Sequence, residues 1–225
     1  VSCADALPRD LRDWRPTVEF MLGPHFCGKD VHEISAQDFA KAAARDRAVF
    51  CREGYGALLA RLARGLPIRL ATPALRIEWK DRVEIETEKG RLNARAVIVT
   101  ASTDTLVSGE LKFVPELPKR QLDALARLPL GSYDHIALEL ARNPLGLDRD
   151  EPVFEKAEGP RTAALLANIG GTSIATVSVG GGFGRDLSQK GEPAMVEFAV
   201  EWLAGLYGSD IRKAVGRAHA TRWNA

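Results

Sequence analysis

Apolar and polar side chains alternate most regularly over residues 74–87. Residues 74–79 and 83–87 each place apolar side chains at about every second position, which predicts two strands with one buried face. Lys89 and Gly90 form a turn signal directly after them. The pattern therefore predicts a small antiparallel meander.

Two short apolar runs flank this meander. Residues 66–70 precede it and residues 96–100 follow it. Runs with little polar alternation are typical of strands covered on both faces, as in parallel sheets. We therefore expect the meander to be inserted between two members of a parallel sheet.

Helices are predicted where cap signals precede periodic apolar positions. They span about residues 35–50, 55–64, 118–128 and 193–207, and residues 1–50 as a whole have a helical, polar-faced pattern. The first has Ser35 as its N-cap and Asp38 in its first turn. The last is strongly apolar, and its predicted buried face consists of Met195, Phe198, Trp202, Leu203 and Leu206.

Strand patterns dominate the segment between the last two helices. Turn signals separate four candidates, at residues 133–140, 152–155, 163–169 and 174–179, which predicts a mostly antiparallel sheet. A final strand is predicted within residues 214–223. The predicted fold class is therefore α+β: an α/β piece with an inserted meander, and a mostly antiparallel sheet with helices.

Composition and charge exclude several classes of function. The formal net charge of +1 over 225 residues gives no reason to expect nucleic acid or another polyanion as a partner. No window of 18 apolar residues exists, so we expect no membrane-spanning helix. The three cysteines are widely spaced and odd in number, which fits free thiols in a reducing, cytoplasmic location.

Neither a metal site nor a phosphate-binding loop is predicted. His25, Cys27 and His32 have no standard zinc-ligand spacing and lack an obvious fourth ligand. Residues 180–185 are rich in glycine, but Arg185 stands where a dinucleotide fingerprint needs its third glycine. We interpret this run as a flexible connection after a strand.

Short motifs in a fixed order resemble the flavin-containing amine oxidases of the monoamine and polyamine oxidase type. They cover most of residues 51–140 and the end of the chain, and read GYGAL at 54–58, ALRI at 74–77, VIVT at 97–100, FVPELP at 113–118, LGSYDH at 130–135 and TRW at 221–223. The resemblance implies an FAD-dependent enzyme. Such an enzyme would oxidise the C–N bond of a small amine to an imine by hydride transfer to the flavin, which O2 then reoxidises.

The resemblance also implies a division into domains. Residues 51–104, with the tail 221–225, correspond to part of a flavin-binding domain, and residues 1–50 and 105–220 correspond to a substrate-binding domain. The family's dinucleotide fingerprint and its flavin-closing segment have no counterpart in the sequence, which predicts an internal piece of a longer enzyme. We therefore expect this chain alone to bind FAD weakly, and its open apolar strands to pair in a homodimer.

Site residues follow from the same motifs. The backbone of Ala74 would contact the adenine, and Thr100, Ala101 and Ser102 end a strand at the edge where open α/β sheets place ligands. Trp223 would lie close to the flavin ring. His135, our candidate catalytic residue, replaces the family lysine that reaches flavin N5 through a water, and this is the main departure from the family pattern.

Two other interpretations stay open at this point. One is a related two-domain flavoprotein of the desaturase or protoporphyrinogen-oxidase type. The other is a non-catalytic binding module that keeps the fold without the cofactor. A full-length protein that purifies yellow would exclude the second.

Overall fold

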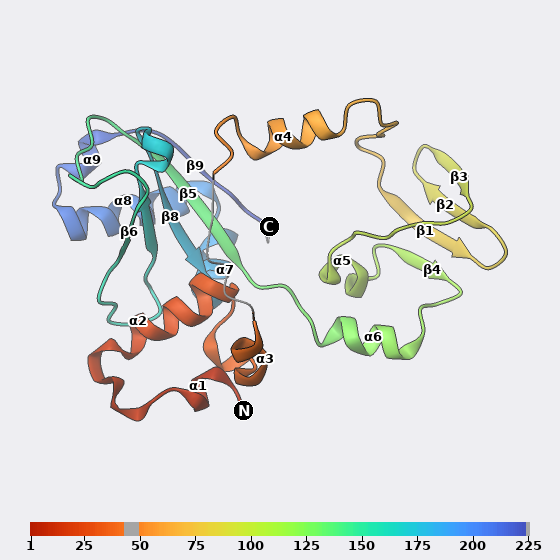
Figure 1. The fold of residues 1–225 in the computed structure, drawn as a ribbon, viewed down its shortest axis with the longest axis horizontal. Helices are drawn as coiled ribbons and strands as arrows, with labels where there is room; N and C mark the ends of the chain where they lie inside the picture. The colour runs from red at the N-terminus through yellow and green to blue at the C-terminus, as the bar shows by residue number, and fades with distance from the viewer. Residues whose placement is uncertain (43–49, 224–225) are drawn as a thin grey trace. The chain divides into compact units, whose positions relative to one another are not determined.

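The computed structural model describes residues 1–42 and 50–223. The chain forms two compact units: Val1–Arg52 with Gly131–Ala225 make the first unit, and Glu53–Leu130 make the second (Figure 1). Each unit holds one sheet with helices, so the predicted α+β class is confirmed. Residues 105–130 were predicted to group with residues 1–50, but their contacts place them in the second unit, and the tail groups with the first unit. The functions predicted for the two domains stay predictions.

The first unit is built on a five-stranded antiparallel sheet in the order β6-β7-β8-β5-β9. Its strands are β5 Tyr133–Leu140, β6 Glu151–Phe154, β7 Ala164–Ala167, β8 Ile174–Gly180 and β9 Val215–Ala220. All five predicted strands are thus confirmed in position. The last ends at Ala220, and the contacts of Thr221 are described below.

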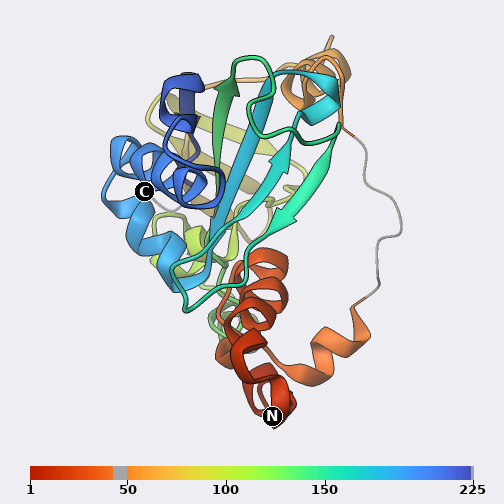
Figure 2. The ribbon, with the colours of Figure 1, turned by 90° about the vertical axis from the view of Figure 1, so that its left-hand side faces the viewer.

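Helices cover one face of this sheet (Figure 2). They are α7 Gly181–Gln189, α8 Glu192–Tyr207 and the short α9 Ile211–Ala214. The core between α8 and the sheet contains side chains with no solvent exposure: Ile136, Leu138, Val177, Met195 and Leu203. The predicted apolar face of α8 is confirmed except at its C-terminal end, where Leu206 is 40% exposed.

Short helical segments make up the N-terminal part of the first unit. They are α1 Cys3–Ala6, the 3₁₀ helix η1 Arg9–Trp14, α2 Arg15–Phe20, the π-helical turn η2 Met21–His25, the 3₁₀ turn η3 Val31–Glu33 and α3 Ala36–Lys41. The Ser35 side chain accepts the Asp38 N–H at 3.3 Å, which confirms the predicted N-cap. The helix ends at Lys41, earlier than predicted, and residues 43–49 of the predicted helix lie outside the described residues.

The second unit contains a four-stranded sheet in the order β3-β2-β1-β4. Its strands are β1 Ala74–Trp79, β2 Val83–Thr87, β3 Gly90–Ala94 and β4 Lys112–Val114, and its helices are α4 Tyr55–Leu62, α5 Thr103–Ser108 and α6 Lys119–Ala126. β1 and β2 form the two predicted antiparallel strands of the meander, β3 pairs antiparallel with β2, and β4 pairs with β1 in parallel. β3, β4 and α5 were not predicted.

The two flanking apolar runs are not strands, so this prediction is wrong. Residues 66–70 and 96–100 form no strand and belong to neither sheet of the described residues. Leu70 is 82% exposed and Ile98 is 88% exposed. An apolar run specifies a buried strand only where neighbouring strands supply hydrogen bonds and cover. Neither segment has such neighbours here.

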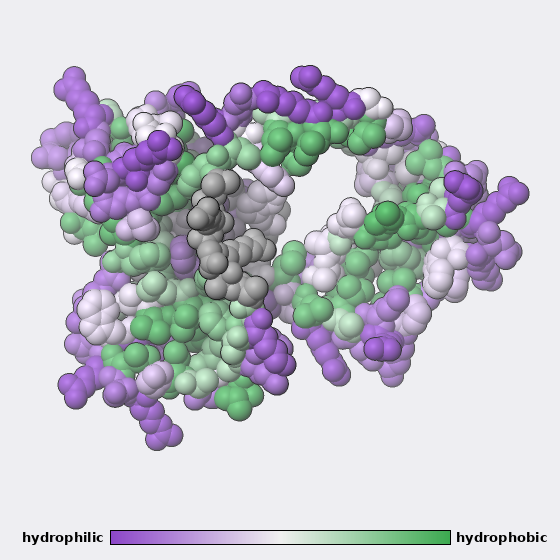
Figure 3. Space-filling model, viewed as in Figure 1, coloured by the Kyte–Doolittle hydropathy of each residue, from purple (hydrophilic) through white to green (hydrophobic). Residues whose placement is uncertain are grey.

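Exposed apolar side chains also follow one side of α4, where Figure 3 shows hydrophobic colour. Leu58, Leu59 and Leu62 are 40%, 47% and 70% exposed. The helix is therefore amphipathic, as predicted, although its apolar face is open to solvent. No helix among the described residues is both long and apolar enough to cross a membrane.

Candidate active site

A cavity of about 430 Å³ lies against the sheet of the first unit. Tyr133 and His135 on β5 and Thr176 and Ser178 on β8 line it. Successive side chains of a strand point to opposite faces, and Ile136 and Val177 belong to the core under α8. The cavity therefore occupies the sheet face turned away from that core.

Rings form much of the cavity wall. The His25 ring lies edge-on to Phe154 with a centroid distance of 5.0 Å, and Tyr133 lies edge-on to His135 at the same distance. Other apolar lining comes from Phe50, Pro152, Ala164, Leu165, Leu166 and Ile169. A cavity of this size and lining matches the sites that bind small organic molecules.

Two hydrogen-bonded pairs supply the polar groups. Tyr133 Oη lies 3.2 Å from His25 Nδ1, and Ser178 Oγ lies 2.9 Å from His135 Nδ1. Desolvation lowers the pKa of His25 and of His135 and raises the pKa of Tyr133. The His135 residue as a whole is exposed to solvent, but its Nδ1 is hydrogen-bonded to Ser178. All of these groups are therefore uncharged at neutral pH.

No full charge faces the cavity from the described residues that line it. They include no carboxylate, ammonium or guanidinium group. A charged ligand would lose hydration there without gaining a counter-charge, which is costly. The cavity therefore suits an uncharged, partly apolar ligand.

His135 and Trp223, two predicted site residues, lie in one network. The Thr221 N–H donates to His135 O at 2.9 Å, and the Trp223 N–H donates to Asp134 Oδ1 at 3.0 Å. Asp134 is fully buried, whereas the Trp223 residue is 78% exposed. The structure thus brings the backbones of these two predicted residues together, although their roles stay predictions.

The other predicted cofactor-binding residues belong to the second unit. Ala74 begins β1, while Thr100 and Ala101 lie in the exposed segment before α5. Ser102 is the N-cap of α5, and its hydroxyl accepts the Thr105 N–H at 3.2 Å. The backbones of Thr100 and Ala101 are thus free to meet a bound group, whereas the Ser102 hydroxyl already has a structural role.

The glycine run at residues 180–185 is not a flexible connection, so that interpretation is wrong. Gly180 ends β8 and Gly181 begins α7. A Cβ on Gly181 would lie 2.5 Å from Asp30 Oδ1, and the Gly182 N–H donates to Asp30 Oδ2 at 3.2 Å. A carboxylate of the chain itself therefore occupies the helix N-terminus that an anion would otherwise bind. The glycines permit this close contact, so among the described residues this turn offers no diphosphate site.

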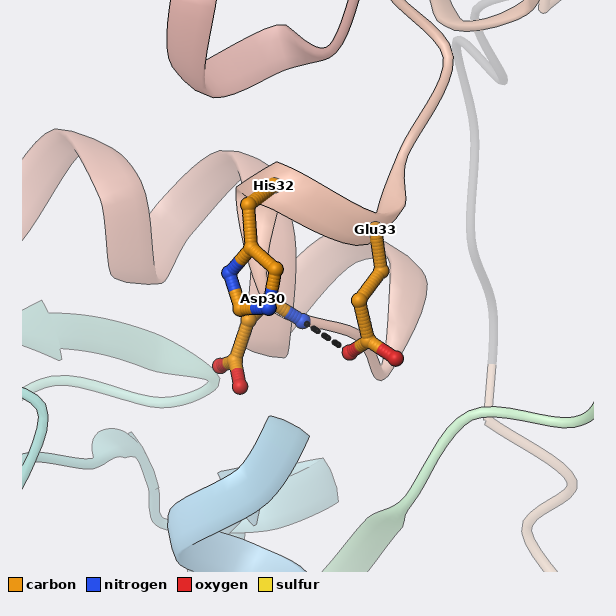
Figure 4. A group of neighbouring side chains, drawn as sticks. All are labelled: Asp30, His32 and Glu33. Atoms are coloured by element: carbon orange, nitrogen blue, oxygen red, sulfur yellow. Dashed lines mark hydrogen bonds between the residues drawn. The ribbon is translucent and has the colours of Figure 1, made fainter.

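Asp30 also belongs to a small group of potential metal ligands with His32 and Glu33 (Figure 4). Their ligand atoms lie within 4.8 Å of one another. Helix capping already accounts for both carboxylates, because Glu33 accepts the Asp30 N–H at 3.3 Å while Asp30 caps α7. His25, which the sequence placed in a weak metal pattern, faces Tyr133 instead. We therefore assign no metal site.

Several cavity residues were not identified from the sequence. Alternation along β5 places Tyr133 on the same face as His135, and alternation along β8 places Thr176 and Ser178 together on one face. The alternation of the sequence could therefore have indicated these three residues. Nothing local in the sequence places His25 or Phe154 beside them, since Tyr133 is 108 residues from His25. Only the tertiary structure identifies these two residues.

Comparisons with known proteins agree on one family. The family model described as flavin containing amine oxidoreductase matches residues 8–225. Mouse lysine-specific histone demethylase 1B is 32% identical over 120 residues, which are 50% of this chain and 14% of that protein. Polyamine oxidase 2 of Arabidopsis thaliana is 25% identical over 180 residues, which are 70% of this chain and 36% of that protein.

Solved structures share the fold. Putrescine oxidase superposes with a TM-score of 0.77 and 17% identity, covering 99% of this chain and 54% of its own. Cyclohexylamine oxidase of Brevibacterium oxydans gives a TM-score of 0.70 and 18% identity, covering 98% of this chain and 52% of its own. This chain thus spans about half of the solved structures it matches and a smaller share of the curated relatives.

Proposed function

We propose, since this chain belongs to the flavin containing amine oxidoreductase family, that it takes part in the FAD-dependent oxidation of a small amine to an imine. The observation that carries the proposal is the uncharged, ring-lined cavity with His135 on its wall. FAD, when bound, would accept the hydride, and O2 would reoxidise it.

The cavity would contribute by selecting the reactive form of the amine. Only an amine with a free lone pair readily gives up a hydride from the neighbouring carbon. The lining of described residues has no carboxylate to stabilise an ammonium group, so the neutral amine is favoured there. The rings of Phe154 and His25 would pack against the apolar part of the substrate and exclude water.

His135 would position the reacting group. Its Nδ1 is paired with Ser178 Oγ at 2.9 Å, which sets the orientation of the ring. Its other nitrogen, Nε2, is then available to bind a water or the amine nitrogen. A neutral imidazole at this place would perform the positioning that the family lysine performs as a cation.

The cofactor-binding residues are proposed from the family motifs. We assign the adenine contact to the backbone of Ala74, further cofactor contacts to Thr100, Ala101 and Ser102, and the ring contact to Trp223. Thr100, Ala101 and Trp223 are exposed and can meet a bound group.

The experiment is anaerobic stopped-flow reduction of the flavin-loaded full-length protein by benzylamine, an apolar monoamine, and by putrescine, a diamine. We expect faster reduction by benzylamine, because the second amino group of putrescine, charged as an ammonium, would find no counter-charge in the lining. His135→Ala should slow flavin reduction at least about tenfold, in line with the loss of a positioned group, and His135→Lys should restore part of the rate.

His219→Ala is the matched control, since His219 is exposed and pairs with Glu192 outside the cavity. Its rate should equal that of the wild type. Unchanged rates in His135→Ala would make that position structural. Failure of every amine to reduce the flavin would favour the related flavoprotein or the non-catalytic module.

A further inference from the structure

We propose that Asp134 is a positioning residue that clamps the backbone of Thr221–Trp223 onto β5 and so presents the Trp223 indole in a fixed place. The role of that indole at the flavin rests on the proposed function. The clamp itself is a property of this chain and is argued from its own contacts.

Asp134 is a fully buried residue on the core side of β5. Its Oδ1 accepts two hydrogen bonds from the tail, from Thr221 Oγ1 at 2.9 Å and from the Trp223 N–H at 3.0 Å. Its Oδ2 is buried without a hydrogen-bond partner among the described residues. A buried carboxyl group strongly favours any state that supplies donors. The tail supplies two of them, so Asp134 holds the tail in place.

Thr221 makes the clamp reciprocal. Its N–H donates to His135 O at 2.9 Å, and its hydroxyl accepts the His135 N–H at 2.9 Å. The hydroxyl donates its single proton to Asp134, since one O–H can donate once and still accept. Because β9 pairs Ala220 with Ile136, Thr221 continues the ladder by one step, with its hydroxyl in place of a backbone carbonyl.

The clamp fixes the backbone of Trp223 but leaves its side chain exposed. Arg222 Nε donates to Ser188 O at 3.2 Å, so each of the three tail residues has a hydrogen bond to the body of the first unit. Trp223 is nevertheless 78% exposed. A fixed backbone with an exposed ring reduces the ordering cost of a later contact.

The same bonds connect the tail to His135. Asp134 and His135 are neighbours on β5, and Thr221 binds both of them. The group proposed to position the amine and the group proposed to face the flavin therefore share one rigid support. A change at Thr221 would therefore act on Trp223 and would also remove the acceptor of the His135 N–H.

The first experiment is amide hydrogen exchange of Trp223, measured by NMR on the chain without flavin. Thr221→Val keeps the shape of the side chain but removes the hydroxyl, and Thr221→Ser keeps the hydroxyl as the matched control. We expect exchange at Trp223 to accelerate at least about tenfold in Thr221→Val, because valine removes both hydrogen bonds of the hydroxyl. Exchange in Thr221→Ser should remain near the wild-type rate.

Asp134 is then tested directly. Asp134→Asn retains an acceptor oxygen and should preserve most of the protection, whereas Asp134→Ala should lose it. Asp134→Ala also removes a buried group from the core. If that variant does not fold, the comparison of Thr221→Val with Thr221→Ser decides whether the clamp exists. Equal exchange at Trp223 in the wild type and in Thr221→Val would overturn the clamp.

A spectroscopic arm separates the clamp from the proposed function. In the flavin-loaded full-length protein, Thr221→Val should shift the visible absorption band of the flavin, whereas the band of Thr221→Ser should stay near that of the wild type. A lost clamp with an unchanged band would overturn the assigned contact between Trp223 and the flavin, while the exchange result would still establish the clamp.

Discussion

The close approach between the end of β8 and the turn η2 can be tested at Gly180. A Cβ at this position would lie 2.3 Å from the carbonyl oxygen of Pro24 and 3.0 Å from that of Ser132. Nonbonded heavy atoms prefer separations of about 3.5 Å, so Pro24 would have to move by about 1 Å to accept the methyl group.

We expect Gly180→Ala to lower the free energy of unfolding by about 1–3 kcal/mol, the usual cost of overpacking. Gly180 has an extended backbone with φ of −157°, so the cost is steric and involves no backbone strain. Pro24 directly precedes His25, whose Nδ1 lies 3.2 Å from Tyr133 Oη. The same substitution should therefore disturb the cavity wall and change the NMR signals of the His25 ring.

The measurement is urea unfolding followed by circular dichroism, with Gly205→Ala as the matched control. Gly205 lies inside α8, and a Cβ there meets no atom within 4 Å. Alanine should stabilise that position by about 0.5–1 kcal/mol, because it loses less backbone entropy than glycine. The two variants should thus shift stability in opposite directions. A Gly180→Ala protein as stable as the wild type would refute the close approach to Pro24.

Two further predictions concern pH and self-association. Burial lowers the pKa of His25 and His135 below the ordinary 6.5. Their contribution to stability is therefore complete above about pH 6.5 and is lost as the pH falls through the lowered pKa values. The urea midpoint should fall on acidification, and a midpoint that does not change with pH would contradict this. Ile98 is 88% exposed in the apolar segment 96–100. Ile98→Asp should therefore reduce self-association in sedimentation velocity more than Val107→Asp, which alters a 54% exposed residue of α5. A wild-type chain that stays monomeric at all concentrations would rule out this association.

Local sequence patterns predicted the elements whose own side chains specify them. The bounds of β5 agree with its alternation, and the Ser35 cap is formed as expected. α8 also follows its apolar period, since Met195 and Leu203 are fully buried. In these elements the period of apolar positions and the cap residue are enough, because one face of each simply packs against the core.

Short or partner-dependent elements were beyond local patterns. β4 has only three residues and exists through its parallel pairing with β1. Residues 66–70 and 96–100 have the composition of buried strands but lie exposed. A strand needs hydrogen-bonding partners from elsewhere in the structure, so composition alone cannot establish one.

The sequence by itself determined the fold class and the family motifs, and it singled out His135, which lines the cavity. The site roles of His135 and Trp223 stay predictions. The tertiary structure decided what surrounds them. It placed Ser178 against His135 across 43 residues, and Thr221 against Asp134 across 87 residues. It also showed that the Asp30 carboxylate caps the glycine-rich turn. The physical reason is that burial, hydrogen bonding and the pKa of a side chain depend on neighbours that are distant in sequence, and only folding brings these together.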